Sequence, residues 1–281
     1  MKIKNIIPAL LLAPLISYAD SSAMFTAAGA HSSWVIMNKV KPTLEKLSGR
    51  EISLFGKQSM LGVGCNSGIK SALKRDTKNE SFGMVCCQLS NEEVAKKNLT
   101  VYPLALEPIM ILSHKSNPIN NLSNKQVKAI FSGKITNWKQ VGGEDKAIVV
   151  VTRLHCKNRP GHWKRILDDA SKFTPKRINV ESADEMVNRV GDFTAAFGHA
   201  GTAWLLSEKS DVKIIKVNGF LPTRINLKNG DYPYFRQLSV ITSKNASAEL
   251  TQLMRNAQKE VFQNPSLTAE YQLLPIDPNS L

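Results

Sequence analysis

Residues 130–143 read IFSGKITNWKQVGG, and this stretch is the most informative part of the sequence for the fold. It begins with the end of an apolar-striped segment that starts after Ser123 and stops at Gly133. Serine is favoured as a helix N-cap and glycine just beyond a helix end, so the sequence predicts a helix between these two residues. Residues 147–153 (AIVVVTR) follow, and their apolar run is typical of a parallel strand buried on both faces. A helix followed by a buried strand indicates an α/β architecture.

Helix and strand patterns alternate along the rest of the chain. Residues 51–57 (EISLFGK) read as a strand, and residues 91–97 (NEEVAKK) as a helix capped by Ser90, with Glu93 completing a capping box. Residues 102–118 form a long apolar run punctuated by prolines. We expect this run to be a strand that leaves one lobe of the protein and enters another.

The N-terminus has the features of an export signal. Lys2 and Lys4 are followed by an apolar stretch over residues 6–16 and by Ala19, which ends a small-residue cleavage pattern. This arrangement is typical of a secretory signal peptide, here residues 1–19. No cysteine stands near the predicted cleavage site, so we expect a periplasmic protein that is not a lipoprotein.

Size and charge limit the classes of protein. A chain of 281 residues is about the length at which one hydrophobic core divides into two. The net charge of +14 at pH 7 suits a small anionic ligand. Nucleic-acid binding is not expected, because the sequence has neither a recognised motif nor a tract rich in lysine and arginine. We expect a monomer without a cofactor, and not an enzyme, because no nucleophile, base and acid stand out together.

The sequence holds four cysteines, and three explanations for them stay open. They are Cys65, Cys86, Cys87 and Cys156. In an exported protein the first expectation is disulfide bonding, with three pairings that the sequence does not distinguish, although a bridge between the adjacent Cys86 and Cys87 would be strained. The second is a Cu(I) or Zn(II) site made by Cys65, Cys86, Cys156 and His155. The third is a redox-active thiol pair.

Several motifs resemble, in the same order along the chain, those of the periplasmic phosphate-binding proteins of ABC importers. They are residues 26–40 (TAAGAHSSWVIMNKV), 116–127 (SNPINNLSNKQV), 130–143 (IFSGKITNWKQVGG), 195–205 (AAFGHAGTAWL) and 232–243 (YPYFRQLSVITS). The resemblance implies a type II periplasmic binding protein fold, in which two α/β lobes joined by hinge strands enclose a ligand cleft. We expect residues 20–107 and 218–281 in lobe one, and residues 108–217 in lobe two.

The sequence departs from the family's ligand loops at three places. Val63 stands where the first loop has a serine, and Cys86 where a later loop has an aspartate that accepts a proton from hydrogen phosphate. In lobe two Arg153 is retained, but residues 157–159 (KNR) replace a Ser-Gly-Thr sequence. We therefore expect an anionic ligand, with inorganic phosphate bound weakly or not at all.

The resemblance also implies which residues contact the ligand. Backbone N–H groups at two helix starts and the basic loop after Arg153 would surround the anion. A helix starting at Pro160 would add its positive end. The predicted ligand-binding residues are Ala30, His31, Gly64, Cys65, Asn66, Ser67, Cys86, Arg153, Lys157, Asn158 and Arg159.

The sequence thus predicts an exported solute-binding protein that captures a small anion, phosphate-like or another oxyanion. Its expected partner is an ABC permease or a membrane sensor. The rival hypothesis is a periplasmic metal-binding or thiol-redox protein on the same scaffold, which would use the four cysteines and His155.

Overall fold

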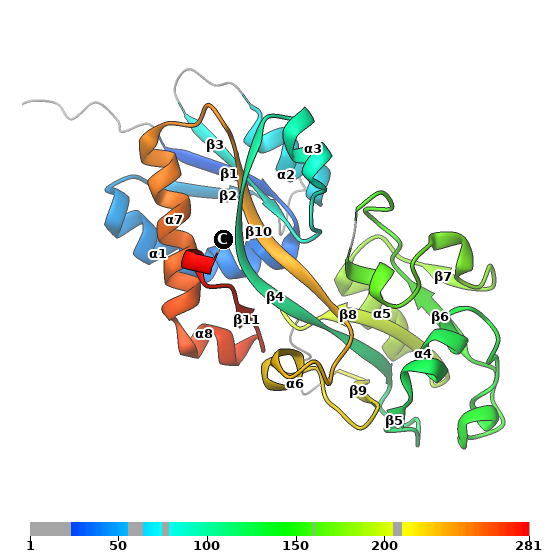
Figure 1. Cartoon of the computed structure of the whole chain (residues 1–281). Helices are drawn as coiled ribbons and strands as arrows, with labels where there is room; N and C mark the ends of the chain where they lie inside the picture. The colour runs from blue at the N-terminus through cyan, green and yellow to red at the C-terminus, as the bar shows by residue number, and fades with distance from the viewer. Residues whose placement is uncertain (1–23, 56–63, 75–78, 160, 205–209, 281) are drawn as a thin grey trace, which may run out of the picture.

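Two long antiparallel strands connect the two halves of the molecule. They are β4 (Leu99–His114) and β10 (Phe235–Ser243), which run side by side from one half to the other (Figure 1). Their register shifts between Leu238 and Ser239, where Pro103 of β4 lies opposite. Proline has no N–H for a neighbouring strand, and a bulge is one place where a sheet tolerates it. The structure is a computed structural model that describes residues 24–55, 64–74, 79–159, 161–204 and 210–280.

The first lobe is a mixed sheet with helices packed against it. Strands β1 (Phe25–Gly29), β2 (Ile52–Phe55) and β3 (Glu80–Val85) are parallel in the order β2-β1-β3, and β10 and then β4 continue the sheet in antiparallel fashion. The short β11 (Leu274–Pro275) pairs with β4. The helices of this lobe are α1 (His31–Ser48), α2 (Cys65–Ala72), α3 (Asn91–Lys96), α7 (Ala248–Gln263) and α8 (Pro265–Glu270).

The second lobe continues the sheet from the other end of β4. Strand β8 (Ala196–Gly201) pairs with β4, β6 (Val149–Thr152) with β8, and β7 (Ile178–Asn179) with β6, while β9 (Val212–Val217) joins β4 and β5 (Asn121–Leu122) joins β9. Its α-helices are α4 (Asn124–Phe131) and α5 (Ala183–Asp192), whereas α6 (Arg224–Lys228) lies beside β11 and β4, with Arg224 donating to Thr268 of the first lobe. Short 3-10 helices are η1 (Trp138–Val141), η2 (His162–Arg165) and η3 (Ala170–Lys172), and η4 (Pro278–Ser280) lies near the C-terminus.

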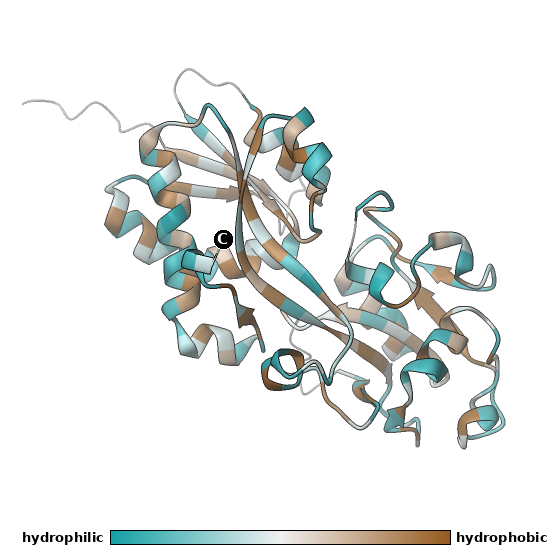
Figure 2. Ribbon diagram, in the orientation of Figure 1, coloured by the Kyte–Doolittle hydropathy of each residue, from teal (hydrophilic) through white to brown (hydrophobic). Residues whose placement is uncertain are grey.

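The hydrophobic side chains form separate cores in the two lobes. One core takes residues from 25–105 and 238–273, together with Ala203, and the other two take residues from 109–234. Apolar residues accordingly colour much of the strands, and polar residues are common on the outer faces of the helices (Figure 2). The boundary between the core of the first lobe and the cores of the second therefore lies near residue 107 on β4 and near residue 236 on β10. The lobe limits expected above, at 107/108 and 217/218, stay a prediction.

The predicted helix caps are present where the structure describes them. Ser123 and Gln126 form a complete capping box on α4, and Gly133 follows that helix with a φ of 75°. The hydroxyl of Ser90 accepts from the N–H of Glu93 on α3. The carboxylate of Glu93 instead accepts hydrogen bonds from Arg159, far along the chain, so it is held away from the reciprocal bond of a capping box.

A buried ion pair lies where the two long strands pass between the lobes. Glu107 of β4 and Arg236 of β10 are fully or almost fully buried and are joined by a direct hydrogen bond. Glu107 also accepts from the N–H of Ala203 at 2.7 Å, and Arg236 donates to the hydroxyl of Ser32 at 2.5 Å. Gly201 packs so closely on the pair that a Cβ there would collide with both side chains. The pair thus connects both strands to the start of α1 and to the segment after β8.

Two expectations fall on residues outside the described ranges. They are the signal peptide, residues 1–19, and the substitution at Val63. Among the described residues, none of the helices combines the length and the apolar character that a membrane span requires.

We predict that Glu107→Gln destabilises the protein strongly. Glutamine can still accept the hydrogen bond from Ala203, but it leaves the charge of Arg236 buried and uncompensated, which typically costs about 3–5 kcal/mol. Chemical denaturation would measure the change in the free energy of unfolding. Glu249→Gln is the matched control, because Glu249 pairs with Arg50 and is half exposed. If Glu107→Gln lowers the free energy of unfolding no more than Glu249→Gln does, the buried ion pair does not have the stabilising role assigned to it.

Candidate functional site

Two helix starts and one strand end of the first lobe meet at the border between the lobes. The N–H of Ala30, just before α1, donates to the carbonyl oxygen of Met84 at 2.8 Å. The N–H of Gly64, just before α2, donates to Gly29 at 3.1 Å. Gly68 of α2 packs on the backbone of Met84 so closely that a Cβ would not fit. Because the N-cap residues are alanine and glycine, neither helix start has a side-chain cap, and first-turn N–H groups are available to a ligand.

The four cysteines gather at this border, and we call them the sulphur cluster. The ligand atoms of Cys65, Cys86 and Cys87, all from the first lobe, lie within 4.8 Å of one another. The same limit holds for Cys87, His155 and Cys156, so the second lobe supplies the remaining members. The sulphurs of Cys65 and Cys86 are 3.7 Å apart, and the N–H of Cys86 donates to the sulphur of Cys65 at 3.2 Å. All four are free thiols in the structure, and the disulfide expected from export stays a prediction.

The four cysteines of the sulphur cluster differ in the direction in which their pKa values are shifted. Hydrogen bonds from Cys65 and Cys87 lower the pKa of Cys156 to about 3. Hydrogen bonds from the same two residues hold the pKa of Cys86 well below its usual range, although burial acts in the opposite direction. The pKa values of Cys65 and Cys87 are raised, first by their hydrogen bonds to Cys156. Cys65 and Cys87 are therefore the hydrogen-bond donors of the cluster, and the sulphurs of Cys86 and Cys156 accept from them.

A row of three histidine rings extends from the cluster into the second lobe. The ring centroids of His155 and His162 are 4.4 Å apart, and those of His162 and His199 are 5.8 Å apart. Burial lowers the pKa of His199 to about 3 and holds the pKa of His162 well below its usual range. Each of the three has one ring nitrogen that is buried without a hydrogen-bond partner among the described residues. Sequence reasoning missed this row, since His162 and His199 are distant from Cys156 along the chain or separated from it by a turn, and no spacing motif links them.

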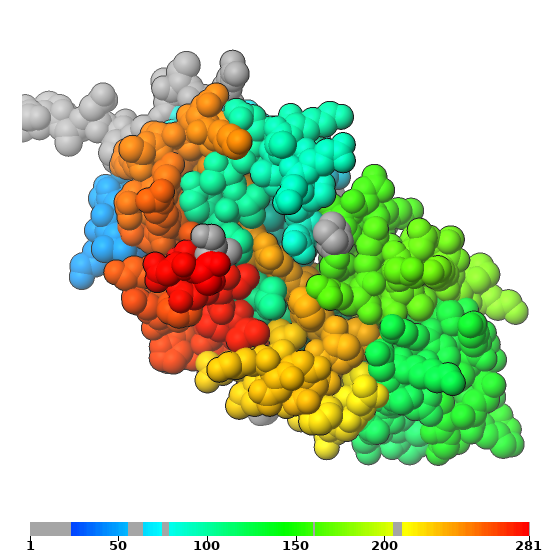
Figure 3. All heavy atoms as spheres, in the orientation of Figure 1, coloured from blue at the N-terminus to red at the C-terminus, as the bar shows by residue number. Residues whose placement is uncertain are grey.

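Arg159 joins the two lobes directly. Its guanidinium group donates to both carboxylate oxygens of Glu93, at 3.0 and 2.8 Å, and to the side-chain oxygen of Asn66 at 2.8 Å. The side chain is 9% exposed and is held by this ion pair, whereas the sequence predicts that it contacts the ligand. Burial lowers the pKa of Arg159, but the ion pair with Glu93 outweighs it and raises the pKa. In the space-filling view the α3 region of the first lobe lies against this part of the second lobe (Figure 3).

The remaining predicted residues fall into two groups. Arg153 lies beside the sulphur cluster, and burial lowers its pKa. Its Nε donates to the carbonyl oxygen of Glu181 at 2.8 Å. Lys157 and Asn158 line a pocket of about 390 Å³ between the lobes. The other residues lining that pocket are Asn66, Ser90, Glu92, Glu93, Lys96, Cys156 and Arg159.

The helix starts hold the other predicted residues. Ala30 and His31 begin α1, and the ring of His31 lies 5.7 Å from that of Trp204 in the second lobe. Gly64, Asn66 and Ser67 belong to the start of α2. The predicted helix at Pro160 is instead a 3-10 helix of four residues, His162–Arg165, and Pro160 itself lies outside the described residues. So short a segment adds little helix dipole to the site.

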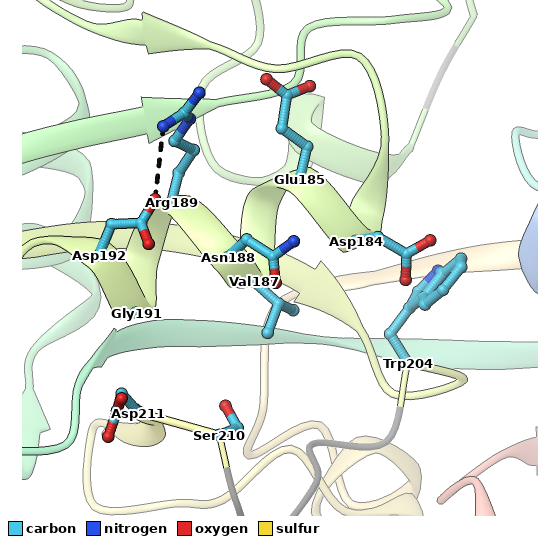
Figure 4. A pocket seen from close by; sticks show the side chains of 10 residues that line it. All are labelled: Asp184, Glu185, Val187, Asn188, Arg189, Gly191, Asp192, Trp204, Ser210 and Asp211. Carbon is cyan, nitrogen blue, oxygen red and sulfur yellow. Dashed lines mark hydrogen bonds and ion pairs between the residues drawn. The ribbon is translucent and has the colours of Figure 1, made fainter.

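A larger pocket, of about 730 Å³, lies on the second lobe beside α5 (Figure 4). It is lined by Asp184, Glu185, Val187, Asn188, Arg189, Gly191, Asp192, Trp204, Ser210 and Asp211. Its one arginine, Arg189, pairs with Asp192, and none of the predicted site residues lines it. The excess of carboxylates makes this pocket unsuitable for an anion, so the border between the lobes is the better candidate site.

Comparison with known proteins shows to which family this chain belongs. A family model described as a PBP superfamily domain matches residues 48–256, and the chain belongs to this family. Its structure is similar to a Clostridium perfringens structure described as a phosphate ABC transporter substrate-binding protein with bound phosphate, at a TM-score of 0.72 and 22% identity over 90% of this chain and 99% of that one. It is also similar to an ABC-type phosphate transport receptor from Vibrio cholerae, at a TM-score of 0.66, 24% identity and the same coverage. These structures establish the two-lobe fold.

Within that superfamily the chain resembles phosphate-binding proteins. It is 25% identical to the phosphate-binding protein PstS of Bacillus subtilis over 178 residues, which cover 63% of this chain and 58% of the relative. Over 121 residues it is 30% identical to PstS 2 of Streptococcus agalactiae, covering 43% of this chain and 38% of the relative. The matched parts thus span 58% and 38% of the length of these two curated relatives. These relatives are binding proteins and not enzymes, and the predicted resemblance to the phosphate-binding family is confirmed.

We predict that Arg159 and Glu93 are energetically coupled. Because both side chains are largely buried, Arg159→Ala and Glu93→Ala should each lower the free energy of unfolding by about 1–3 kcal/mol, and the double variant should lose clearly less than the sum. A double-mutant cycle by chemical denaturation measures this coupling. The exposed pair Lys172–Asp168 provides the matched control and should show no measurable coupling. If the double variant loses the full sum of the two single losses in free energy of unfolding, the ion pair between Arg159 and Glu93 contributes nothing to stability.

We predict that His199 makes the protein sensitive to acid. Its pKa is about 3 in the folded state, below the unfolded value near 6.5, so protons bind the unfolded chain first as the pH falls. The stabilisation is complete above about pH 6.5 and decreases towards pH 3, by about 3 kcal/mol at pH 4. Unfolding free energies at pH 7 and pH 4 should therefore differ less in His199→Phe than in the wild type. His114→Gln, on the surface, should keep the wild-type dependence.

Proposed function

We propose that this protein is an exported solute-binding protein that captures a small anion between its two lobes. The observation that carries the proposal is the meeting of two uncapped helix starts, α1 and α2, with the basic segment of residues 153–159 from the other lobe. A site formed by both lobes couples ligand binding to lobe closure. The similar proteins are described as phosphate-binding proteins and ABC transport receptors, which supports the same class of ligand.

The charge around the site supports an anion. First-turn N–H groups carry partial positive charge, which attracts anions at helix starts. Arg153 and Lys157 add full charges, whereas the charge of Arg159 is neutralised by Glu93. Arg159 therefore acts in this proposal by holding the lobes together and only secondarily by attraction of the ligand.

The ligand is an oxyanion that does not need to donate a proton to the protein. Cys86 stands where the resemblance implies an aspartate, and the structure surrounds its sulphur with other thiols. The sulphur of Cys86 already accepts hydrogen bonds from Cys65 and Cys87, and sulphur is a weaker acceptor than a carboxylate oxygen, so Cys86 is a poor partner for the hydroxyl of hydrogen phosphate. A fully ionised oxyanion, such as sulfate, needs only donors and suits the helix starts better.

The proposed setting is the periplasm. Residues 1–19 would direct export and be removed, leaving a monomer without a lipid anchor that delivers its ligand to an ABC permease or a membrane sensor. The basic overall charge and the relatives described as transport receptors support this setting.

We predict weak phosphate binding and tighter binding of another oxyanion. Calorimetry of the metal-free, reduced protein with phosphate, sulfate and molybdate should give micromolar affinity for at least one anion other than phosphate. Arg153→Ala should weaken that binding about ten- to a hundredfold, the cost of about one charge-assisted bond. Arg189→Ala, at the surface of α5, is the control and should bind as the wild type does. If none of the three anions binds, or if Arg153→Ala binds unchanged, the proposal fails.

A further inference from the structure

The sulphur cluster has a geometry that anion capture does not explain. It contains every cysteine of the sequence, three from the first lobe and Cys156 from the second. The sulphurs of Cys65, Cys86 and Cys87 are buried, and Cys156 faces both the cluster and the pocket between the lobes. Three buried thiols contribute little to the binding of an oxyanion, because each is only a weak hydrogen-bond donor.

The distances in the cluster fit a metal ion. Four thiolate sulphurs bound tetrahedrally at about 2.3 Å from an ion lie about 3.8 Å from one another. The sulphurs of Cys65 and Cys86 are 3.7 Å apart, and each triad containing Cys87 lies within 4.8 Å. Because the two triads share Cys87, an ion beside that sulphur would lie close to thiolates from both lobes.

The surroundings of the cluster also favour bound thiolates. Arg153 lies close enough to interact electrostatically with Cys86, and its positive charge offsets part of the negative charge that several thiolates would bring, whereas the charge of Arg236 is already paired with Glu107. His155 contributes one ring nitrogen to the second triad; its Nδ1 lies 3.3 Å from the carbonyl oxygen of Arg153, and its Nε2 is buried without a partner among the described residues. A ligating or neighbouring imidazole is common at such sites.

We propose that Cys65, Cys86, Cys87 and Cys156 bind one thiophilic metal ion, Cu(I) or Zn(II), with His155 beside them as an alternative ligand. Soft thiolate ligands select these ions over hard cations such as Mg²⁺ and Ca²⁺. Because Cys156 belongs to the second lobe, the ion would bridge the lobes at the point where Arg159 already joins them. A cation held in this way is a different ligand from the anion proposed above, and it does not require that anion.

Metal titration of the reduced, metal-free mature chain tests the proposal. Zn(II) and Cu(I) are added in separate arms against a chelator of known affinity, and bound metal is counted after gel filtration. Co(II) serves as a spectroscopic probe in a third arm. We expect one ion per chain, the intense visible absorption of a tetrahedral cobalt–thiolate site, and loss of reactivity of the thiols towards a cysteine reagent. Whichever of Zn(II) and Cu(I) binds more tightly is the ion that the site selects.

Variants assign the site to the cluster. Cys156→Ser removes the one sulphur of the second lobe and should weaken metal binding by at least about tenfold, and Cys87→Ser should weaken it similarly. His114→Gln, at a surface histidine, should bind metal as the wild type does. Circular dichroism shows whether each variant is folded, and the cobalt spectrum of the wild type decides the question if a cysteine variant does not fold.

The outcomes separate this proposal from the proposed function. Retention of less than one ion per chain with four reactive thiols overturns the metal site, as does a cobalt spectrum without thiolate character or unchanged affinity in the folded Cys156→Ser variant. Anion calorimetry of the metal-free protein is measured independently. Metal binding without anion binding supports the metal site and refutes anion capture, and the reverse result does the opposite.

Discussion

The buried ion pair between Glu107 and Arg236 is the contact on which the relation between the two lobes depends. Each long strand contributes one of the charges where it passes from one lobe to the other. Buried charges must be paired and hydrogen-bonded, so the second carboxylate oxygen of Glu107 and the end of Arg236 also need partners. Ala203 and Ser32 are those partners. The hinge strands, the start of α1 and the segment after β8 are thereby positioned together.

The candidate site follows from this arrangement. With α1 fixed at Ser32, the hydrogen bond from Gly64 to Gly29 brings the start of α2 alongside, and Cys65 meets Cys86 at the end of β3. The second lobe then presents Cys156 to the same point. Sulphur in these positions changes the chemistry of an anion-binding scaffold, because thiols are weak partners for oxyanions and thiolates are strong ligands for soft metal ions.

The two arginines of the basic loop show how position decides the role of a charge. Arg153 donates to the carbonyl oxygen of Glu181 and forms no ion pair among the described residues, so its charge can act on ligands or thiolates nearby. Arg159 is neutralised by Glu93 and is largely buried. The two residues are six positions apart and would look equivalent as basic residues in one segment. The charge of Arg153 is free to attract an anion, whereas Arg159 holds the two lobes together.

The sequence by itself determined the α/β fold, most helix caps and the family, because these depend on local patterns: Ser123 and Gly133 around an apolar stripe, or the run of residues 102–118 that became β4. It also pointed to Cys65, Cys86, Cys156 and His155 as one alternative site, through loops that a related fold would bring together. Only the tertiary structure decided that Arg159 pairs with Glu93 and that three histidine rings lie edge to face behind the cluster. Those contacts join residues that neither spacing nor periodicity connects, since they exist only after two lobes have folded against each other.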